Sequence, residues 1–139
     1  MAYSEAIAND SSFALAYYRM EVVLLWDPPT KHAYEGPGYY RIQATTRNHG
    51  LGARDSLLIA ADSAAWAGDS QLGYFHDAMA RLDTAARRFP GDPEVWYALG
   101  EARYHFPTGF GEDYVQSLAA FDRAIALDPK LADAHAALG

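Results

Sequence analysis

The sequence repeats itself, and this repetition constrains the fold more than any other feature. The stretch that begins at Ala2 resembles the stretch that begins at Ala120, at an offset of 118 residues. Offsets of 39 and 79 residues relate these two stretches to the segments between them. A repeat of this length indicates a chain built from similar supersecondary units. At the offset of 39, the matched pairs are Phe75 with Tyr114, Met79 with Leu118, Leu82 with Phe121, Ala85 with Ala124, Pro90 with Pro129, Leu99 with Leu138 and Gly100 with Gly139.

Each repeated block carries the apolar spacing of an α-helix. Apolar residues step by three and four along residues 72–89, and the same stripe recurs along residues 114–125. Pro90 and Pro129 follow the two stripes, and proline directly after a helix cannot continue it. The spacing therefore predicts a helix in each block with its apolar stripe facing the core.

Partner helices are expected beside these stripes. Pro93 suits the first turn of a helix, and Asp92 is the expected N-cap. A similar helix is expected from Phe13 to Trp26, where Asp27 and two prolines end it. Helices paired in this way form a series of helical hairpins. The apolar stripe of the helix after Pro93 is predicted at Val95, Leu99, Ala102 and Phe106.

The middle of the chain has a weaker pattern. Residues 27–38 are rich in proline and glycine and are predicted to form a loop. A short helix is expected within residues 39–50, and Asp55 or Ser56 is expected to cap a helix that runs to Trp66. No run alternates apolar and polar residues over the length of a strand. These features predict an all-α chain of about seven helices.

At these positions the chain resembles the tetratricopeptide repeat family, whose 34-residue helix-turn-helix unit has characteristic residues in both helices. The resemblance implies a right-handed α-solenoid of antiparallel helix hairpins that binds other proteins. It also implies a single domain over residues 1–139. Trp96, Leu99 and Gly100 match the first helix of the unit, and Phe121, Ala124 and Pro129 match the second helix and its end.

The units implied by the resemblance are longer than the family standard. The expected units are residues 13–50, 54–90 and 93–129, flanked by a second helix at 1–10 and a first helix at 131–139. Surplus residues are expected in two loops, at 27–38 and 106–113. Units with such loops look similar to tetratricopeptide regions of bacterial regulators linked to serine/threonine kinases or cyclases.

In this family the first helices line a concave groove that binds a protein or peptide. The groove of this chain is expected to be aromatic, apolar and acidic. The side chains that bind a peptide carboxylate in chaperone-binding members are replaced by Tyr97, Ala98 and Glu101, so that binding mode is not expected. The alternative is that the tyrosines only pack between repeats. The expected groove residues are Leu15, Tyr18, Val22, Leu25, Glu94, Tyr97, Glu101 and Tyr104.

No pattern of catalytic or metal-binding residues competes with this interpretation. The five histidines lack the spacing of a zinc site, and the sequence has no cysteine. The glycine pairs at 36–38, 50–52 and 109–111 follow no predicted strand and lack the lysine of a phosphate-binding loop. We therefore expect no enzyme activity, no cofactor and no metal.

Charge and hydropathy narrow the class of partner. The formal net charge is -7, with only 11 lysine and arginine residues, which disfavours nucleic acid as a partner. No leader peptide and no long apolar run are visible, so no membrane insertion is expected. These features favour a cytoplasmic protein, with an extracellular filament as the alternative.

The two ends of the chain suggest self-association. On the repeat pattern, the chain starts within a second helix and ends within a first helix, and neither end carries a polar capping helix. A head-to-tail contact between copies would be heterologous and would extend into a filament or tube unless a ring closes. The alternative is a fragment of a longer array that recruits a partner protein. The expected contact residues are Tyr3 and Ile7 at one end, and Leu131, His135 and Leu138 at the other.

Overall fold

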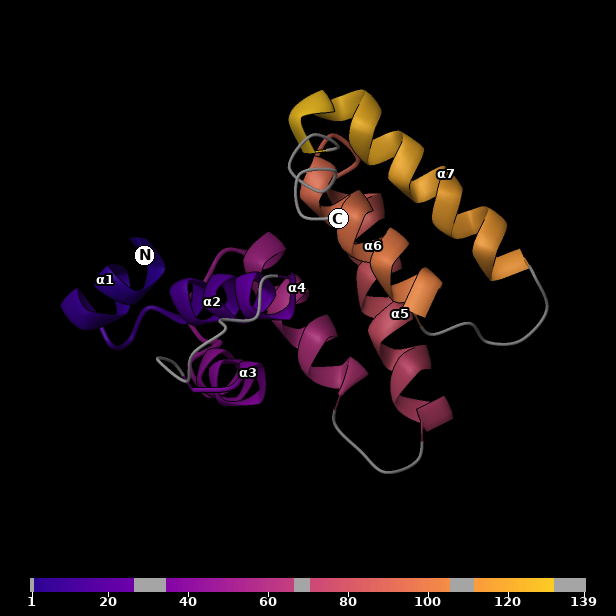
Figure 1. Cartoon of the computed structure of the whole chain (residues 1–139). Helices are drawn as coiled ribbons and strands as arrows, with labels where there is room; N and C mark the ends of the chain where they lie inside the picture. Colours follow the sequence, from indigo (N-terminus) through magenta and orange to yellow (C-terminus); the bar gives the residue numbers. More distant parts are fainter. Residues whose placement is uncertain (1, 27–34, 67–70, 106–111, 132–139) are drawn as a thin grey trace. The chain divides into compact units, whose positions relative to one another are not determined.

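The structure, a computed structural model, describes residues 2–26, 35–66, 71–105 and 112–131, without the side chains of residues 26, 71–75, 112 and 113. Within these ranges the chain forms helices and no strand, so the predicted all-α class is confirmed (Figure 1). A short helical turn at residues 129–131 follows the last labelled helix. The labelled helices are α1 (Ala2–Asn9), α2 (Ala14–Trp26), α3 (Pro37–Thr46), α4 (Ala53–Ala65), α5 (Gln71–Arg88), α6 (Pro93–His105) and α7 (Glu112–Leu127).

The helices belong to two compact units, residues 1–63 and residues 64–139. In the first unit, α2 packs against α1 and α3. In the second unit, α6 packs against both α5 and α7. Each unit is thus organised around one helix that contacts its two neighbours along the chain, as expected for consecutive hairpins.

The start of α6 confirms the predicted cap. The Asp92 carboxylate oxygen Oδ1 accepts hydrogen bonds from the backbone N–H groups of Glu94, at 3.0 Å, and Val95, at 3.2 Å. These two N–H groups have no partner within the helix, so the side chain satisfies donors that the first turn leaves open. Asp92 therefore sets the residue at which α6 begins.

Two helices begin earlier than predicted. The loop expected to reach Gly38 ends sooner, because Pro37 already lies in the first turn of α3. Proline has the backbone angle of a helix and needs no N–H partner there, so it starts α3. The N-cap expected at Asp55 or Ser56 was also wrong. The Ser56 N–H donates to Gly52 O at 3.0 Å, so α4 is already helical by Asp55, which forms an ion pair with Arg54 in its first turn.

The core of the second unit contains the predicted stripe of α6. Val95, Leu99 and Ala102 are buried, while Phe106 lies outside the described residues. Leu82 and Ala86 from the predicted stripe of α5 are buried as well. Apolar residues of both helices therefore form one packed layer, which stabilises their pairing.

The predicted stripe of α7 lies elsewhere. Ser117, Ala120 and Ala124 are the buried residues of α7, each at most 1% exposed. Tyr114, Leu118 and Ile125, expected to face the core, are 41% or more exposed, and Phe121 is half-buried. Small side chains allow the axes of two helices to approach closely, so α7 turns its small residues toward its partner.

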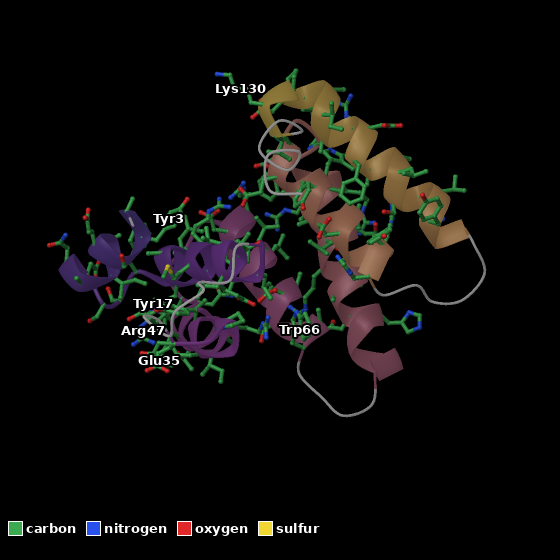
Figure 2. All side chains as sticks on the ribbon, viewed as in Figure 1. Tyr3, Tyr17, Glu35, Arg47, Trp66 and Lys130 are labelled. Atoms are coloured by element: carbon green, nitrogen blue, oxygen red, sulfur yellow. The ribbon has the colours of Figure 1, made fainter. Side chains whose placement is uncertain are left out.

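The first unit has a denser core around α2. Met20 and Leu24 of α2 are buried together with Tyr40 and Ala44 of α3. Figure 2 shows Arg47, at the end of α3, next to Tyr17 of α2. The Arg47 guanidinium carbon lies 4.8 Å from the centre of the Tyr17 ring, a cation–π contact that links the two helices.

Candidate functional site

The same backbone turn occurs at three places in the chain. Each turn is centred on one residue and has two hydrogen bonds. The N–H of the central residue donates to the carbonyl four residues before it, and its carbonyl accepts from the N–H three residues after it. The three turns are separated by the 79 and 39 residues found in the sequence. The first bond joins Asp10 N to Ala6 O (2.8 Å), Phe89 N to Ala85 O (2.8 Å) and Asp128 N to Ala124 O (2.9 Å). The second joins Phe13 N to Asp10 O (3.2 Å), Asp92 N to Phe89 O (3.0 Å) and Leu131 N to Asp128 O (3.1 Å). The sequence offsets therefore correspond to equivalent backbone geometry.

The hairpin of α6 and α7 shows how a first and a second helix fit together. The buried Ser117 hydroxyl donates a hydrogen bond to the carbonyl of Gly100 at 2.9 Å. The ring of Phe121 covers the Cα of Gly100, and its centre lies 5.6 Å from that of Tyr97. Gly100 is thus the residue of α6 that lets the backbones approach, because a larger residue has no room beneath the ring.

The four groove residues predicted on α6 have unequal exposure. Glu94, Tyr97 and Glu101 are half-buried, while Tyr104 is 54% exposed. Tyr97 packs on Phe121 of the same hairpin, which agrees with the alternative of tyrosines that pack between helices. Tyr104 instead approaches Tyr114 of α7, with ring centres 6.4 Å apart. Of these residues, Tyr104 offers the largest open aromatic surface.

The groove residues predicted on α2 are mostly covered. Tyr18 is buried, and burial raises the pKa of its hydroxyl, with Asp62 adding to the shift. Leu15 and Val22 are half-buried, and Leu25 is exposed. The ring of Tyr18 is therefore part of the core of the first unit, while Leu25 is the open apolar side chain of this set.

An apolar surface runs along α7 and is formed by Tyr114, Val115, Leu118 and Ile125, which we call the open face of α7. Each of these side chains is at least 41% exposed. Leu118 lies four residues after Tyr114, three after Val115 and seven before Ile125, so the four side chains lie toward one side of the helix. Clustered exposed apolar side chains mark surfaces that bind other proteins.

The residues predicted for the terminal faces are only partly described. Tyr3 of α1, labelled in Figure 2, is 37% exposed, and Ile7 is half-buried. Leu131 is half-buried at the end of the described chain. His135 and Leu138 lie outside the described residues. The helix α1 has no buried residue, unlike the equivalent helix α7.

A cluster of charged side chains lies within the first unit, and sequence reasoning missed it. Arg41 of α3 contacts the carboxyl group of Glu21 of α2 and forms an ion pair with Asp62 of α4, with 3.2 Å between Arg41 Nε and Asp62 Oδ2. The Glu21 side chain is fully buried, and those of Arg41 and Asp62 are 15% and 20% exposed. One guanidinium thus joins three helices through two carboxyl groups.

The two carboxyl groups of this cluster share a proton at neutral pH. The pKa of Glu21 is raised to about 9, first by burial and then by Asp62, while Arg41 acts to lower it. Burial also raises the pKa of Asp62, while the Glu21 hydrogen bond and Arg41 lower it. Glu21 therefore keeps its proton at neutral pH, while the Asp62 carboxylate pairs with Arg41.

This cluster supports the fold of the first unit. A buried ion pair adds little net stability but fixes which groups must meet, because an unpaired buried charge is costly. The signal in the sequence was Glu21 itself, a single carboxylate inside the apolar run of α2. A carboxylate in such a run indicates a buried partner, yet the identity of that partner depends on which helices pack together.

Comparison with known proteins identifies no relative of this chain. No protein family, no characterised protein and no solved structure matches this chain. Of the helices in the described ranges, none is both long enough and apolar enough to cross a membrane. Over the same residues, no three histidine, aspartate or glutamate side chains gather as metal ligands would.

Proposed function

We propose that this chain is a non-catalytic scaffold for protein–protein interaction, built from tetratricopeptide-like repeats, which associates with further copies of itself head-to-tail. The observation that supports this proposal is the turn that recurs at Asp10, Phe89 and Asp128 with the same two backbone hydrogen bonds. Equivalent turns at equivalent positions are the property of repeat arrays, in which each unit buries its apolar face on a neighbour.

The open face of α7 supports the same proposal. The offset of 39 residues relates α7 to α5, and it places Ile125 at the position of Ala86. Ala86 is buried, and α6 packs on α5. Ile125 itself is 41% exposed. A repeat position that is covered in one unit and open in another is a surface for the next helix, from this chain or from another copy.

Self-association is tested by the molar mass of the purified chain across micromolar concentrations, measured by sedimentation velocity or light scattering. We expect the mass to rise with concentration, because a heterologous contact adds copies one at a time. Leu118→Asp should lower the mass, since it charges the open face of α7. Gln116→Asp is the matched control, on an exposed residue of α7 that points about 160° away from Leu118 around the helix.

A monomer at every concentration would overturn self-association. In that case the second candidate is a region that recruits another protein, as in a larger bacterial regulator. The exposed pair of Tyr104 and Tyr114 favours this second candidate, since aromatic side chains are enriched where proteins bind one another. Equal masses for Leu118→Asp and Gln116→Asp would show that the open face of α7 takes no part in self-association.

A further inference from the structure

In each unit an arginine joins three helices, but the two arginines have different partners. In the first unit, Arg41 of α3 contacts the carboxyl groups of Glu21 on α2 and Asp62 on α4. In the second unit, Arg103 of α6 pairs with Asp83 of α5, with 2.9 Å between Nη2 and Oδ1, and its Nη1 donates to a backbone carbonyl of α7 at 3.5 Å. The first cluster therefore has two carboxyl groups for one guanidinium, and the second has one.

The first cluster is electrically neutral only when one of its carboxyl groups holds a proton. The Glu21 side chain is fully buried, and the side chains of Arg41 and Asp62 are 15% and 20% exposed, so water screens little of a surplus charge. The burial that raises the pKa of Glu21 agrees with this charge balance. The pair in the second unit is neutral without a proton, and the Asp83 side chain is 40% exposed. The two units therefore differ in whether the folded state must retain a proton.

The ionisable groups around Glu21 leave this surplus in place. Besides burial, the charge of Asp62 raises the pKa of Glu21, and the charge of Arg41 lowers it. Tyr18, one turn earlier on α2, is also buried, and burial raises the pKa of its hydroxyl. Arg41 is thus the cation that balances Glu21 and Asp62. Arg19 of α2 and Arg54 of α4 act on Tyr18, Arg54 also pairs with Asp55, and Tyr3 and Glu5 of α1 are exposed.

We infer that the first unit opens by itself as the pH rises, while the second unit stays folded, because opening lets the cluster of Glu21, Arg41 and Asp62 release its surplus proton to water. The division of the chain into two compact units supports such a separate opening. The inference stands apart from the proposed self-association, since all three members of the cluster lie within residues 1–63 of one copy.

The direction of the effect follows from the two states of Glu21. The pKa of Glu21 is near 4.5 when its side chain is solvated and about 9 in the folded unit, where burial keeps the proton bound. Between these two values the open form holds one proton fewer than the folded form. A rise in pH therefore favours opening, by up to about tenfold per pH unit for one proton.

Hydrogen exchange of the full chain, followed by mass spectrometry between about pH 6 and about pH 8, tests this opening. The protection factor divides out the pH dependence of the chemical exchange step, so it reports the opening equilibrium. We expect the protection factors of α2 and α3 to fall by up to about tenfold per pH unit, and those of α6 and α7 to change little. Equal falls in both units would mean that the whole chain unfolds, and constant values in α2 and α3 would mean that no proton is released. Either result overturns the inference.

Two variants test whether the charge balance of the cluster is the cause. Glu21→Gln removes the group that holds the proton, and Asp62→Asn leaves one carboxyl group for one guanidinium. Either change should flatten the fall of the α2 and α3 protection factors with pH, whatever it does to their absolute values. Glu5→Gln, the same change on an exposed residue of the first unit, is the matched control and should keep the fall.

A fall as steep in Glu21→Gln and Asp62→Asn as in the unchanged chain would show that another group releases the proton, and the inference would be wrong. If one variant fails to fold, the other variant and the comparison between the two units of the unchanged chain still decide the question. Self-association is measured separately by molar mass, so failure of this inference leaves the proposed function in place.

Discussion

Gly100 of α6 lies beneath the ring of Phe121 of α7, so closely that a Cβ at Gly100 would come within 2.7 Å of the ring. The neighbouring Ser117 hydroxyl donates to the Gly100 carbonyl at 2.9 Å. Glycine within a helix is unfavourable, and here the close approach of two helices compensates for it.

Gly100→Ala should destabilise the second unit. The added methyl group overpacks the contact with Phe121, which typically costs about 1–3 kcal/mol. Gly38→Ala is the control, because Gly38 also lies in a helix but has open space around it. That change should be neutral or stabilise by up to about 1 kcal/mol. Urea unfolding followed by circular dichroism measures both, and equal free energies of unfolding would contradict the Gly100–Phe121 contact.

Glu21→Gln should flatten the pH dependence of stability. The pKa of Glu21 is near 4.5 in the unfolded chain and about 9 in the folded protein, so the unfolded state releases the proton first as pH rises. The free energy of unfolding should therefore fall as pH rises from about 4.5 to about 9, by at most about 1.4 kcal/mol per pH unit. Asp62, whose pKa is also raised, acts with the same sign.

Glutamine at position 21 remains neutral at every pH and keeps a donor for Asp62. Denaturant unfolding at several pH values between the two pKa values gives the slope. Glu5→Gln, on an exposed residue of α1, should keep the slope of the unchanged protein. A Glu21→Gln variant with an unaltered slope would show that Glu21 does not carry the buried proton.

Arg41→Met should be strongly destabilising. It removes the guanidinium that contacts Glu21 and pairs with Asp62, and breaking a buried ion pair costs about 3–5 kcal/mol. Arg81→Met is the control, because Arg81 pairs with Asp77 at the surface of α5 with both side chains at least 41% exposed. Such a pair contributes at most about 1 kcal/mol. Thermal unfolding measures the stability of both variants. Equal stability of Arg41→Met and Arg81→Met would show that Arg41 does not join the three helices.

Asp92→Ala should weaken the start of α6. Two backbone N–H groups lose their acceptor, and loss of an N-cap costs about 1 kcal/mol. Asp92→Asn keeps an acceptor oxygen and should retain most of the stability. Thermal melts of the three proteins decide the point, and a melting temperature for Asp92→Ala equal to that of the unchanged protein would mean that the cap is dispensable.

The sequence predicted the all-α class, the cap at Asp92 and the register of the repeat, because each depends on residues close together in the chain. It failed where a distant helix decides the outcome. The large apolar residues of α7 were expected in the core, yet Ser117 and Ala124 are buried instead, because α6 and α7 approach closely at Gly100 and small side chains fit between their axes. The triad of Glu21, Arg41 and Asp62 was missed for the same reason, because its members come from three helices.

Local periodicity and turn chemistry determined by themselves where this chain forms helices and at which offsets its units repeat. Hydrogen bonds in the turns after Ala6, Ala85 and Ala124 involve residues only a few positions apart, so the sequence contains the information for them. The side of α7 that is buried was decided by the tertiary structure, whereas the stripe predicted for α6 is the buried one. Burial depends on how closely two helices approach, and at α6 and α7 that approach is set by one glycine and one aromatic ring on different helices.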